Sequence, residues 1–161
     1  MSSIPTPDGE AITSEGLRAL EAELAELETA GRREMADRIN AARSLGDLKE
    51  NADYHIAKDD QAHLETTIKR LRKRLRDAVV VEPDSGSATF DFGRTADVVD
   101  EATGRRHTWT IVGPTEADLS NGRLSAESPV ARGLLGGSPG AVVSVATPRG
   151  ARRYRIEKLL S

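Results

Sequence analysis

Two long stretches of helical periodicity, separated by a short break, constrain the fold of this chain more than any other feature. Apolar residues recur every three or four positions in residues 13–44 and again in residues 57–78, and the break between them contains Gly46-Asp47-Leu48-Lys49-Glu50-Asn51-Ala52-Asp53-Tyr54. Helices joined by so short a connection fold back on each other, so segment 46–54 is expected at the far end of a hairpin. The first helix alone would extend over about 48 Å.

The apolar residues of both stretches form stripes of the coiled-coil type. The first stripe contains Leu17, Leu20, Leu24, Leu27, Gly31, Met35, Ile39 and Ala42, and the second contains Ala57, Leu64, Ile68, Leu71, Leu75 and Ala78, with Gln61 at a polar position. Each helix is too polar to be stable alone, whereas antiparallel pairing buries both stripes. A plain helical bundle is the alternative, but no third or fourth helix is available to complete it. Thr13 or Ser14 is expected to cap the first helix.

The second half of the chain has a different periodicity. Residues 1–12 are expected to be an extended arm, and a Pro/Gly/Ser-rich linker at 82–87 separates the helices from segments that alternate with period two. Strands are predicted at 95–100, 105–112, 123–127, 141–147 and 152–159, and a short helix at 130–135. We therefore predict a two-domain α+β protein: a coiled-coil hairpin at 1–82, and at 83–161 a mostly antiparallel sheet with one short helix.

Composition excludes several classes of function. The chain has no cysteine, which excludes disulfides, thiolate nucleophiles and cysteine-based zinc sites. No apolar run approaches the roughly 18 residues needed to cross a bilayer, and a signal-peptide pattern is missing, so no membrane association and a cytoplasmic location are expected. His55, His63 and His107 form no cluster, and no Ser/His/Asp arrangement is apparent. Self-contained enzyme chemistry has no support.

The acidic residues of segment 46–54 are the first candidates for chemistry. Asp47 and Glu50 are three residues apart and Asp53 follows three residues later, so all three would share one face if 47–54 began a helix. Paired carboxylates can hold Mg²⁺, which prefers oxygen ligands. Two carboxylates are too few for a tight site, so Asp47 and Glu50 would form half of a site that a metal-carrying partner completes.

A structural interpretation of the same acids is open as well. Asp47-Leu48-Lys49-Glu50 fits a capping pattern, in which Asp47 accepts from the first helical N–H groups and Glu50 reaches back three residues. The helix dipole also favours acids in a first turn. From spacing alone, the capping interpretation is favoured over the metal interpretation.

A basic run occupies the second helix farther from the loop. Six of the eight residues from Lys69 to Arg76 are lysine or arginine. Most of them are expected to form a solvated surface around Leu71 and Leu75. Contact with a phosphate backbone or with an acidic protein surface stays open, although base recognition is not expected because aromatic residues are absent from the run.

Segment 42–55, Ala-Arg-Ser-Leu-Gly-Asp-Leu-Lys-Glu-Asn-Ala-Asp-Tyr-His, closely resembles the tip signature of bacterial GreA-type transcript-cleavage factors. The second half resembles the same family through Ile111-Val112-Gly113, Glu116-Ala117-Asp118, Ser128-Pro129-Val130-Ala131-Arg132-Gly133-Leu134-Leu135-Gly136 and Thr147-Pro148-Arg149-Gly150. The resemblance covers nearly the whole chain, with the motifs in the expected order.

This resemblance implies an antiparallel coiled coil followed by an FKBP-like domain, in a monomer that binds RNA polymerase. The hairpin would enter the secondary channel, where a backtracked complex extrudes its nascent RNA 3′ end. The tip acids would help retain a second Mg²⁺ and orient water, so that the active centre of the polymerase hydrolyses the phosphodiester bond. The protein would be a transcription elongation factor, and the polymerase would be the enzyme.

Individual roles follow from the same resemblance. Asp47 and Glu50 match the two acidic tip positions and would be the catalytic and Mg²⁺-binding residues. Arg43 and Lys58 match basic positions that face the extruded RNA. Asn51 and Tyr54 match residues that shape the loop.

The chain also departs from the family pattern. Asp53 stands where the family usually has Glu, which we expect to be tolerated. The FKBP-like resemblance brings no prolyl isomerase activity, because that pocket needs several aromatic residues and this domain has only Phe90, Phe92, Trp109 and Tyr154.

Two other functions are compatible with the pattern. One is a non-catalytic channel-binding regulator or inhibitor of polymerase with the same architecture, and the other is a coiled-coil interaction or chaperone module. The presence of both tip acids favours the cleavage factor over the inhibitor.

Overall fold

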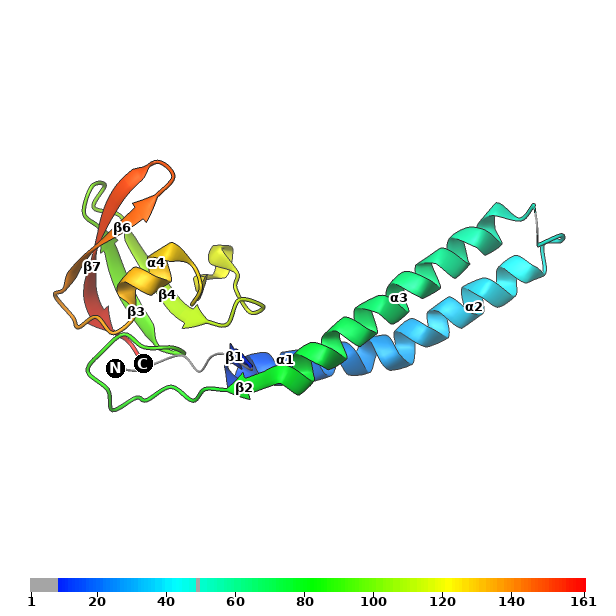
Figure 1. The fold of residues 1–161 in the computed structure, drawn as a ribbon, viewed down its shortest axis with the longest axis horizontal. Helices are drawn as coiled ribbons and strands as arrows, with labels where there is room; N and C mark the ends of the chain where they lie inside the picture. The colour runs from blue at the N-terminus through cyan, green and yellow to red at the C-terminus, as the bar shows by residue number, and fades with distance from the viewer. Residues whose placement is uncertain (1–8, 49) are drawn as a thin grey trace. The chain divides into compact units, whose positions relative to one another are not determined.

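The computed structural model describes residues 9–48 and 50–161, which form two compact units (Figure 1). One unit is helical and spans Leu17–Asp77, and the other joins the chain up to Gly16 with Ala78–Ser161. Most of the arm expected at residues 1–12, and Lys49 of the loop, lie outside the described residues. The domain boundary expected at residues 82–83 stays a prediction, since these compact units are discontinuous in sequence.

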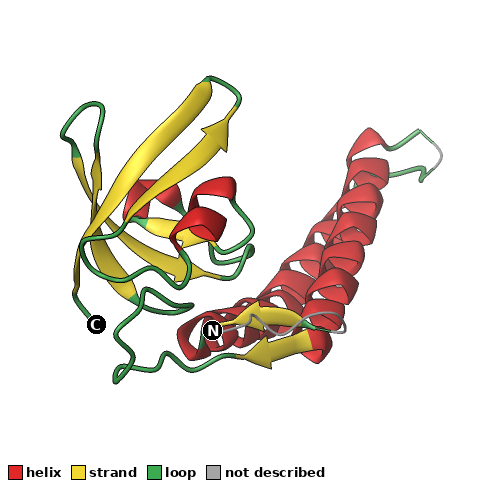
Figure 2. Cartoon of the chain, turned by 60° about the vertical axis from the view of Figure 1, so that its left-hand side comes forward, coloured by secondary structure: helices red, strands yellow, loops and turns green. Residues whose placement is uncertain are grey.

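The helical unit is the predicted antiparallel hairpin. Its elements are α1 (Ser14–Glu26), whose first turn belongs to the other unit, a π-helical stretch (Leu27–Gly31), α2 (Arg32–Arg43) and α3 (Ala52–Asp77). In both views α2 and α3 lie side by side (Figures 1 and 2). All predicted stripe residues are buried or half-buried, and the best-buried are Leu20, Leu24, Ile39, Ala42, Ala57, Ile68 and Leu71. This packing confirms the two predicted stripes.

Ion pairs across the hairpin fix its direction. They join Glu28 to Arg72 at 3.0 Å, Arg32 to Glu65 at 3.0 Å and Arg38 to Asp60 at 2.9 Å. Residue numbers rise along the first helix as they fall along the second, which is the antiparallel arrangement. These side chains are partly exposed, so the pairs set the register more than they add to stability.

The π-helical stretch was not predicted from the sequence. It begins at Leu27, where the stripe changes to steps of four residues. A π-helical turn takes up one more residue than an α-helical turn. The half-buried Leu27 and Met35 therefore both stay on the apolar stripe.

The second unit contains a five-stranded sheet that confirms the predicted α+β class. Its strands are β3 (Thr95–Asp100), β4 (Arg106–Val112), β5 (Arg123–Ser125), β6 (Val142–Thr147) and β7 (Gly150–Leu159), in the order β5-β4-β3-β7-β6. All neighbours are antiparallel except β4 and β5. The curled sheet is drawn in yellow in Figure 2.

The short helix α4 (Pro129–Leu134) completes the core of this sheet. Ser128 caps the helix as expected, because its hydroxyl accepts from the Ala131 N–H at 3.2 Å. Ala131 and Leu134 are fully buried among residues of the sheet and its loops. The core contains Ala11, Phe90, Phe92, Ala96, Val98, Trp109, Ile111, Leu124, Ala126, Ala131, Leu134, Val145, Tyr154 and Ile156.

A second, two-stranded sheet was not predicted. β1 (Glu10–Ile12) pairs in parallel with β2 (Ala78–Val80), and the Val81 N–H donates to the Ile12 carbonyl at 2.9 Å. Strands of three residues are too short to show a period, and the two segments lie far apart in sequence. Within the described residues, no helix combines the length and apolar character required to span a membrane.

Candidate functional site

Asn51 shapes the tip of the hairpin by joining the ends of two helices. Its side-chain oxygen accepts from the Tyr54 N–H at 3.0 Å, which caps α3. Its side-chain amide donates to the Ala42 carbonyl at 2.5 Å, in the last turn of α2. One half-buried side chain therefore satisfies a donor at the start of α3 and an acceptor at the end of α2.

This geometry corrects the capping interpretation of the acids. α3 begins at Ala52, so Asp47 and Glu50 precede the helix and only Asp53 lies in its first turn. Because α3 begins only at Ala52, the condition under which the three acids would share one helical face is not met. The capping-box interpretation that the spacing favoured is wrong. The acid spacing fitted both patterns, but the Asn51 side chain is the one that reaches both helix ends.

The acids of the tip are exposed to solvent. Asp47, Glu50 and Asp53 are all exposed. Their hard oxygen donors fit Mg²⁺. In residues 9–48 and 50–161, no group of three or more histidine or acidic side chains could hold a metal ion. A metal held by Asp47 and Glu50 would need further ligands from another molecule.

The other predicted tip residues lie on the two helices that flank the loop. The Arg43 guanidinium lies 5.9 Å from the centre of the Tyr54 ring, a cation–π distance. Tyr54 also meets the His55 ring edge-on, with centroids 5.6 Å apart. Lys58 lies farther along α3, and its ammonium donates to the Gln61 side chain at 3.1 Å. The structure thus brings Arg43 and Tyr54 together and leaves Lys58 outside this pair.

An apolar groove beside the acids was missed from the sequence. Its volume is about 490 Å³, and it is lined by Arg38, Ala41, Ala42, Ser44, Leu45, Asp53, Ile56 and Ala57. Leu45 and Ile56 are 69% and 54% exposed, and the neighbouring Leu48 is 41% exposed. Ile56 stands one position before Ala57 of the stripe, and this off-stripe placement is the signal in the sequence. Clustered exposed apolar side chains are typical of an interaction surface.

The basic run lies along α3, farther from the tip. Leu71 is buried and Leu75 half-buried, as expected. Arg72 is engaged with Glu28, whereas Lys69 and Lys73 are exposed. What this surface contacts stays open.

In the comparison with known proteins, two family models match successive parts of the chain. The model of the family described as "Transcription elongation factor, N-terminal" matches residues 10–80, and that described as "Transcription elongation factor, GreA/GreB, C-term" matches residues 84–160.

Individual relatives match over almost their full length. The transcription elongation factor GreA of Rhodopseudomonas palustris is 44% identical over 149 residues, covering 92% of this chain and 93% of the relative. GreA of Bacillus velezensis is 40% identical over 148 residues, covering 92% and 94%. Among solved structures, Gfh1 of Thermus thermophilus, a GreA factor homolog, is 26% identical with a TM-score of 0.43, covering 95% and 99%.

The two family models and the GreA relatives cover both halves of the chain and confirm the resemblance seen in its motifs. The chain belongs to the GreA/GreB family of transcription elongation factors.

Proposed function

We propose that this protein binds RNA polymerase, inserts its helical hairpin into the secondary channel and stimulates cleavage of the backtracked RNA 3′ end. The observation that carries the proposal is the pair of exposed carboxylates, Asp47 and Glu50, on the end of the long hairpin. Fold stability does not require acids at that place, because Asn51 already joins the helix ends.

In this proposal the tip residues have separate tasks. Asp47 and Glu50 hold Mg²⁺ together with ligands from the polymerase, and they orient the water that attacks the phosphodiester bond. When bound, the ion supplies charge stabilisation at the phosphate and makes water more acidic. Arg43 and Lys58 neutralise phosphates of the extruded RNA. Tyr54, beside Arg43, and Asn51 keep the loop in shape.

The catalyst in this reaction is the polymerase, and the protein stimulates an activity that the polymerase already has. Two carboxylates cannot build a complete hydrolytic site, and the described residues contain no larger metal-binding group that would. We infer that the protein works as a monomer in the cytoplasm, where its polymerase partner is found.

The exposed groove at the tip fits this proposal as well. Leu45 is 69% exposed, and burying such an apolar side chain against a partner surface would make the free energy of binding more favourable. The polymerase channel would cover it when the hairpin is inserted.

The test is a cleavage assay on an arrested polymerase complex supplied with Mg²⁺. The wild-type protein should release a 3′ RNA fragment, and the double variant Asp47→Asn/Glu50→Gln should bind polymerase but release none. Asp59→Asn, which changes an exposed carboxylate on α3, is the matched control and should cleave normally.

Other results would point elsewhere. A wild-type protein that binds but releases no fragment would refute the proposal in favour of the non-catalytic regulator. A protein that fails to bind polymerase would favour a coiled-coil interaction module.

A further inference from the structure

The hairpin of β6 and β7 has a pocket for which the proposed cleavage reaction has no use. Its volume is about 260 Å³, and it is lined by Thr147, Pro148, Arg149, Arg152 and Tyr154. All five residues belong to the sheet-containing unit, so the pocket lies within one compact body. Two of the five side chains are guanidinium groups, which gives the pocket a positive charge.

The backbone of the turn gives this pocket a defined shape. Gly150 has a φ of +109°, a conformation that residues with a side chain rarely adopt. The Thr147 hydroxyl donates to the Gly150 carbonyl at 2.6 Å and closes the turn. The ring of Pro148 restricts its own φ. Arg149 therefore belongs to a turn whose backbone is restrained on both sides.

Tyr154 forms the buried side of the pocket. It is 5% exposed, and its ring meets that of Trp109 edge-on with centroids 5.6 Å apart. Arg152 precedes it by two positions on β7, so both side chains lie on the same face of the sheet. The Tyr154 hydroxyl and, less strongly, the Asp100 carboxylate raise the pKa of Arg152 above its ordinary value. The phenol and the guanidinium therefore lie close together.

The positive charge of this hairpin is only partly balanced. Residues 128–156 contain five arginines and no acidic residue. Arg152 lies 3.8 Å from the buried Asp100, and its side chain is still 49% exposed. Within residues 9–48 and 50–161, Arg149 takes part in no ion pair. An anion in the pocket would supply the missing negative charge.

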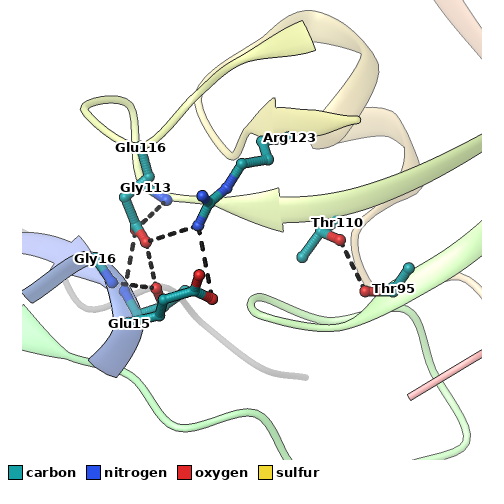
Figure 3. A network of polar contacts seen from close by, with 8 residues as sticks. Glu15, Gly16, Thr95, Thr110, Gly113, Glu116 and Arg123 are labelled. Carbon is teal, nitrogen blue, oxygen red and sulfur yellow. Dashed lines mark hydrogen bonds and ion pairs between the residues drawn. The ribbon is translucent and has the colours of Figure 1, made fainter. Parts of the chain in front are cut away.

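A carboxylate elsewhere in the same unit shows the opposite situation. Glu116, in the loop between β4 and β5, is 5% exposed. It accepts from the Thr13 N–H at 3.1 Å, and Arg123 lies 3.8 Å from it (Figure 3). The Thr13 hydroxyl donates to Glu116 and accepts from the Gly16 N–H at 3.0 Å, so Thr13 is the predicted cap of α1. Glu116 has its partners inside the protein, whereas Arg149 can bind a ligand.

We propose that this pocket binds the phosphate group of a small ligand through Arg149, Arg152 and the Tyr154 hydroxyl. A guanidinium presents five N–H donors in a planar fork that matches a phosphate. Two forks and a phenol offer more donors than a carboxylate, with about four acceptor sites, can use. The pocket is smaller than the range of about 300–1,000 Å³ that is typical for drug-sized ligands, so a phosphate group suits it.

The geometry favours a single phosphate group over a nucleic-acid backbone. A groove that follows a backbone needs basic residues along successive phosphates. Arg153 is the next exposed arginine, but neighbouring residues of a strand point to opposite faces. Arg153 therefore lies on the other face of β7 from Arg152. This arrangement also provides a matched control.

Three variants separate the pocket from general attraction to positive charge. Arg149→Gln removes one charge from the pocket, and Arg153→Gln removes the same charge from the other face of β7. Arg152→Lys keeps a positive charge beside the buried Asp100 but loses the planar fork. Urea unfolding followed by the fluorescence of Trp109, the single tryptophan, verifies that each variant is folded.

The experiment is a titration of the ¹⁵N-labelled full chain with inorganic pyrophosphate at constant ionic strength. In the wild type, the arginine Nε–H signals of Arg149 and Arg152 should shift and saturate, and the variants assign these signals. Arg149→Gln should weaken binding by about tenfold or more, the scale of a lost hydrogen bond to a charged group. Arg152→Lys should weaken it several-fold, and Arg153→Gln should leave it unchanged.

Either of two results would overturn the proposal. One is a wild-type titration without a saturable shift. The other is an equal loss of affinity in Arg149→Gln and Arg153→Gln, and an RNA oligonucleotide that binds more tightly than pyrophosphate with this same pattern would assign the arginines to a nucleic-acid surface. The titration involves neither polymerase nor cleavage, so its outcome is independent of the proposed function.

Discussion

The tip and the root of the hairpin use carboxylates in opposite ways. At the tip, Asp47 and Glu50 are exposed to solvent in a loop that another residue, Asn51, holds in place. At the root, Glu116 is 5% exposed and accepts from two backbone N–H groups and a hydroxyl. The buried carboxylate of Glu116 serves the fold, whereas the exposed carboxylates of the tip are accessible to another molecule.

The family assignment gives this contrast a functional meaning. Both carboxylate sites belong to segments that resemble family motifs, the tip signature at 42–55 and the motif Glu116-Ala117-Asp118. Sequence resemblance treats the two segments alike. The two segments differ in burial: the tip acids are exposed and can contact another molecule, whereas Glu116 is buried.

The largest expected effect comes from the tip. Asp47→Ala should lower stimulated cleavage by about 100-fold or more, the scale of losing the correct position of a reacting group. Unfolding of the protein by urea should be unchanged, because the side chain is exposed. A variant that unfolds more easily would break the comparison by showing that the acid serves the fold.

For Glu116→Ala the expected effect is on stability. Removing the carboxylate leaves the buried N–H groups of Thr13 and Gly113 without acceptors, each at a cost of about 1–3 kcal/mol. The free energy of unfolding of the sheet-containing unit should fall by about 2–6 kcal/mol. Trp109 fluorescence in urea follows the unfolding. Glu127→Ala is the control, and equal stability of the two variants would contradict the structural role.

Asn51 should have an effect of intermediate size, because it holds the loop that carries the exposed acids but is not itself an acid. Asn51→Ala should destabilise the hairpin by about 1–2 kcal/mol, since a cap and a link to α2 are lost together. Asn51→Asp keeps the acceptor for Tyr54 and loses the donor to Ala42, so it should retain part of the stability. Thermal melting followed by far-UV circular dichroism measures both, and melting of Asn51→Ala at the wild-type temperature would contradict this role.

The smallest expected effect concerns Glu65, a partly exposed carboxylate with one defined partner. Its hydrogen bonds with Arg32 hold the pKa of Glu65 below the ordinary value of a glutamate. A pKa lowered by folding stabilises the protein above the unfolded pKa, and this stabilisation is lost as the pH falls through the folded pKa.

Arg32→Ala should therefore raise the pKa of Glu65 towards its ordinary value. The free energy of unfolding of this variant should then fall less steeply than that of the wild type as the pH is lowered. Carbon NMR of the side-chain carboxyl follows the titration. High salt should weaken the shift in the wild type, because the pair is accessible to solvent. If the pKa of Glu65 in Arg32→Ala stayed at its lowered wild-type value, a group other than Arg32 would set this pKa.

Prediction from the sequence succeeded where the signal was periodic. The stripe from Leu17 to Ala42 predicted the first helical half of the hairpin, and period-two alternation predicted β3 over residues 95–100. Ser128-Pro129 predicted the start of α4. In each case the residues that define the element are neighbours in the chain, so local pattern carries the information.

Prediction failed at the tip for a different reason. The spacing of Asp47 and Glu50 is compatible with a capping box, and nothing in the spacing distinguishes a cap from a turn. Asn51 became the cap because its amide can accept from Tyr54 and donate to Ala42 together. A carboxylate has no donor for the Ala42 carbonyl.

The sequence by itself determined the two helical stripes, the order of the strands along the chain and the family to which the protein belongs. Only the tertiary structure decided the parallel pairing of β1 with β2 and the burial of Glu116 against Thr13. The physical reason is distance along the chain. Periodicity and motifs record what neighbouring residues prefer, whereas the contact between Thr13 and Glu116 joins residues 103 positions apart and exists only after both segments have packed.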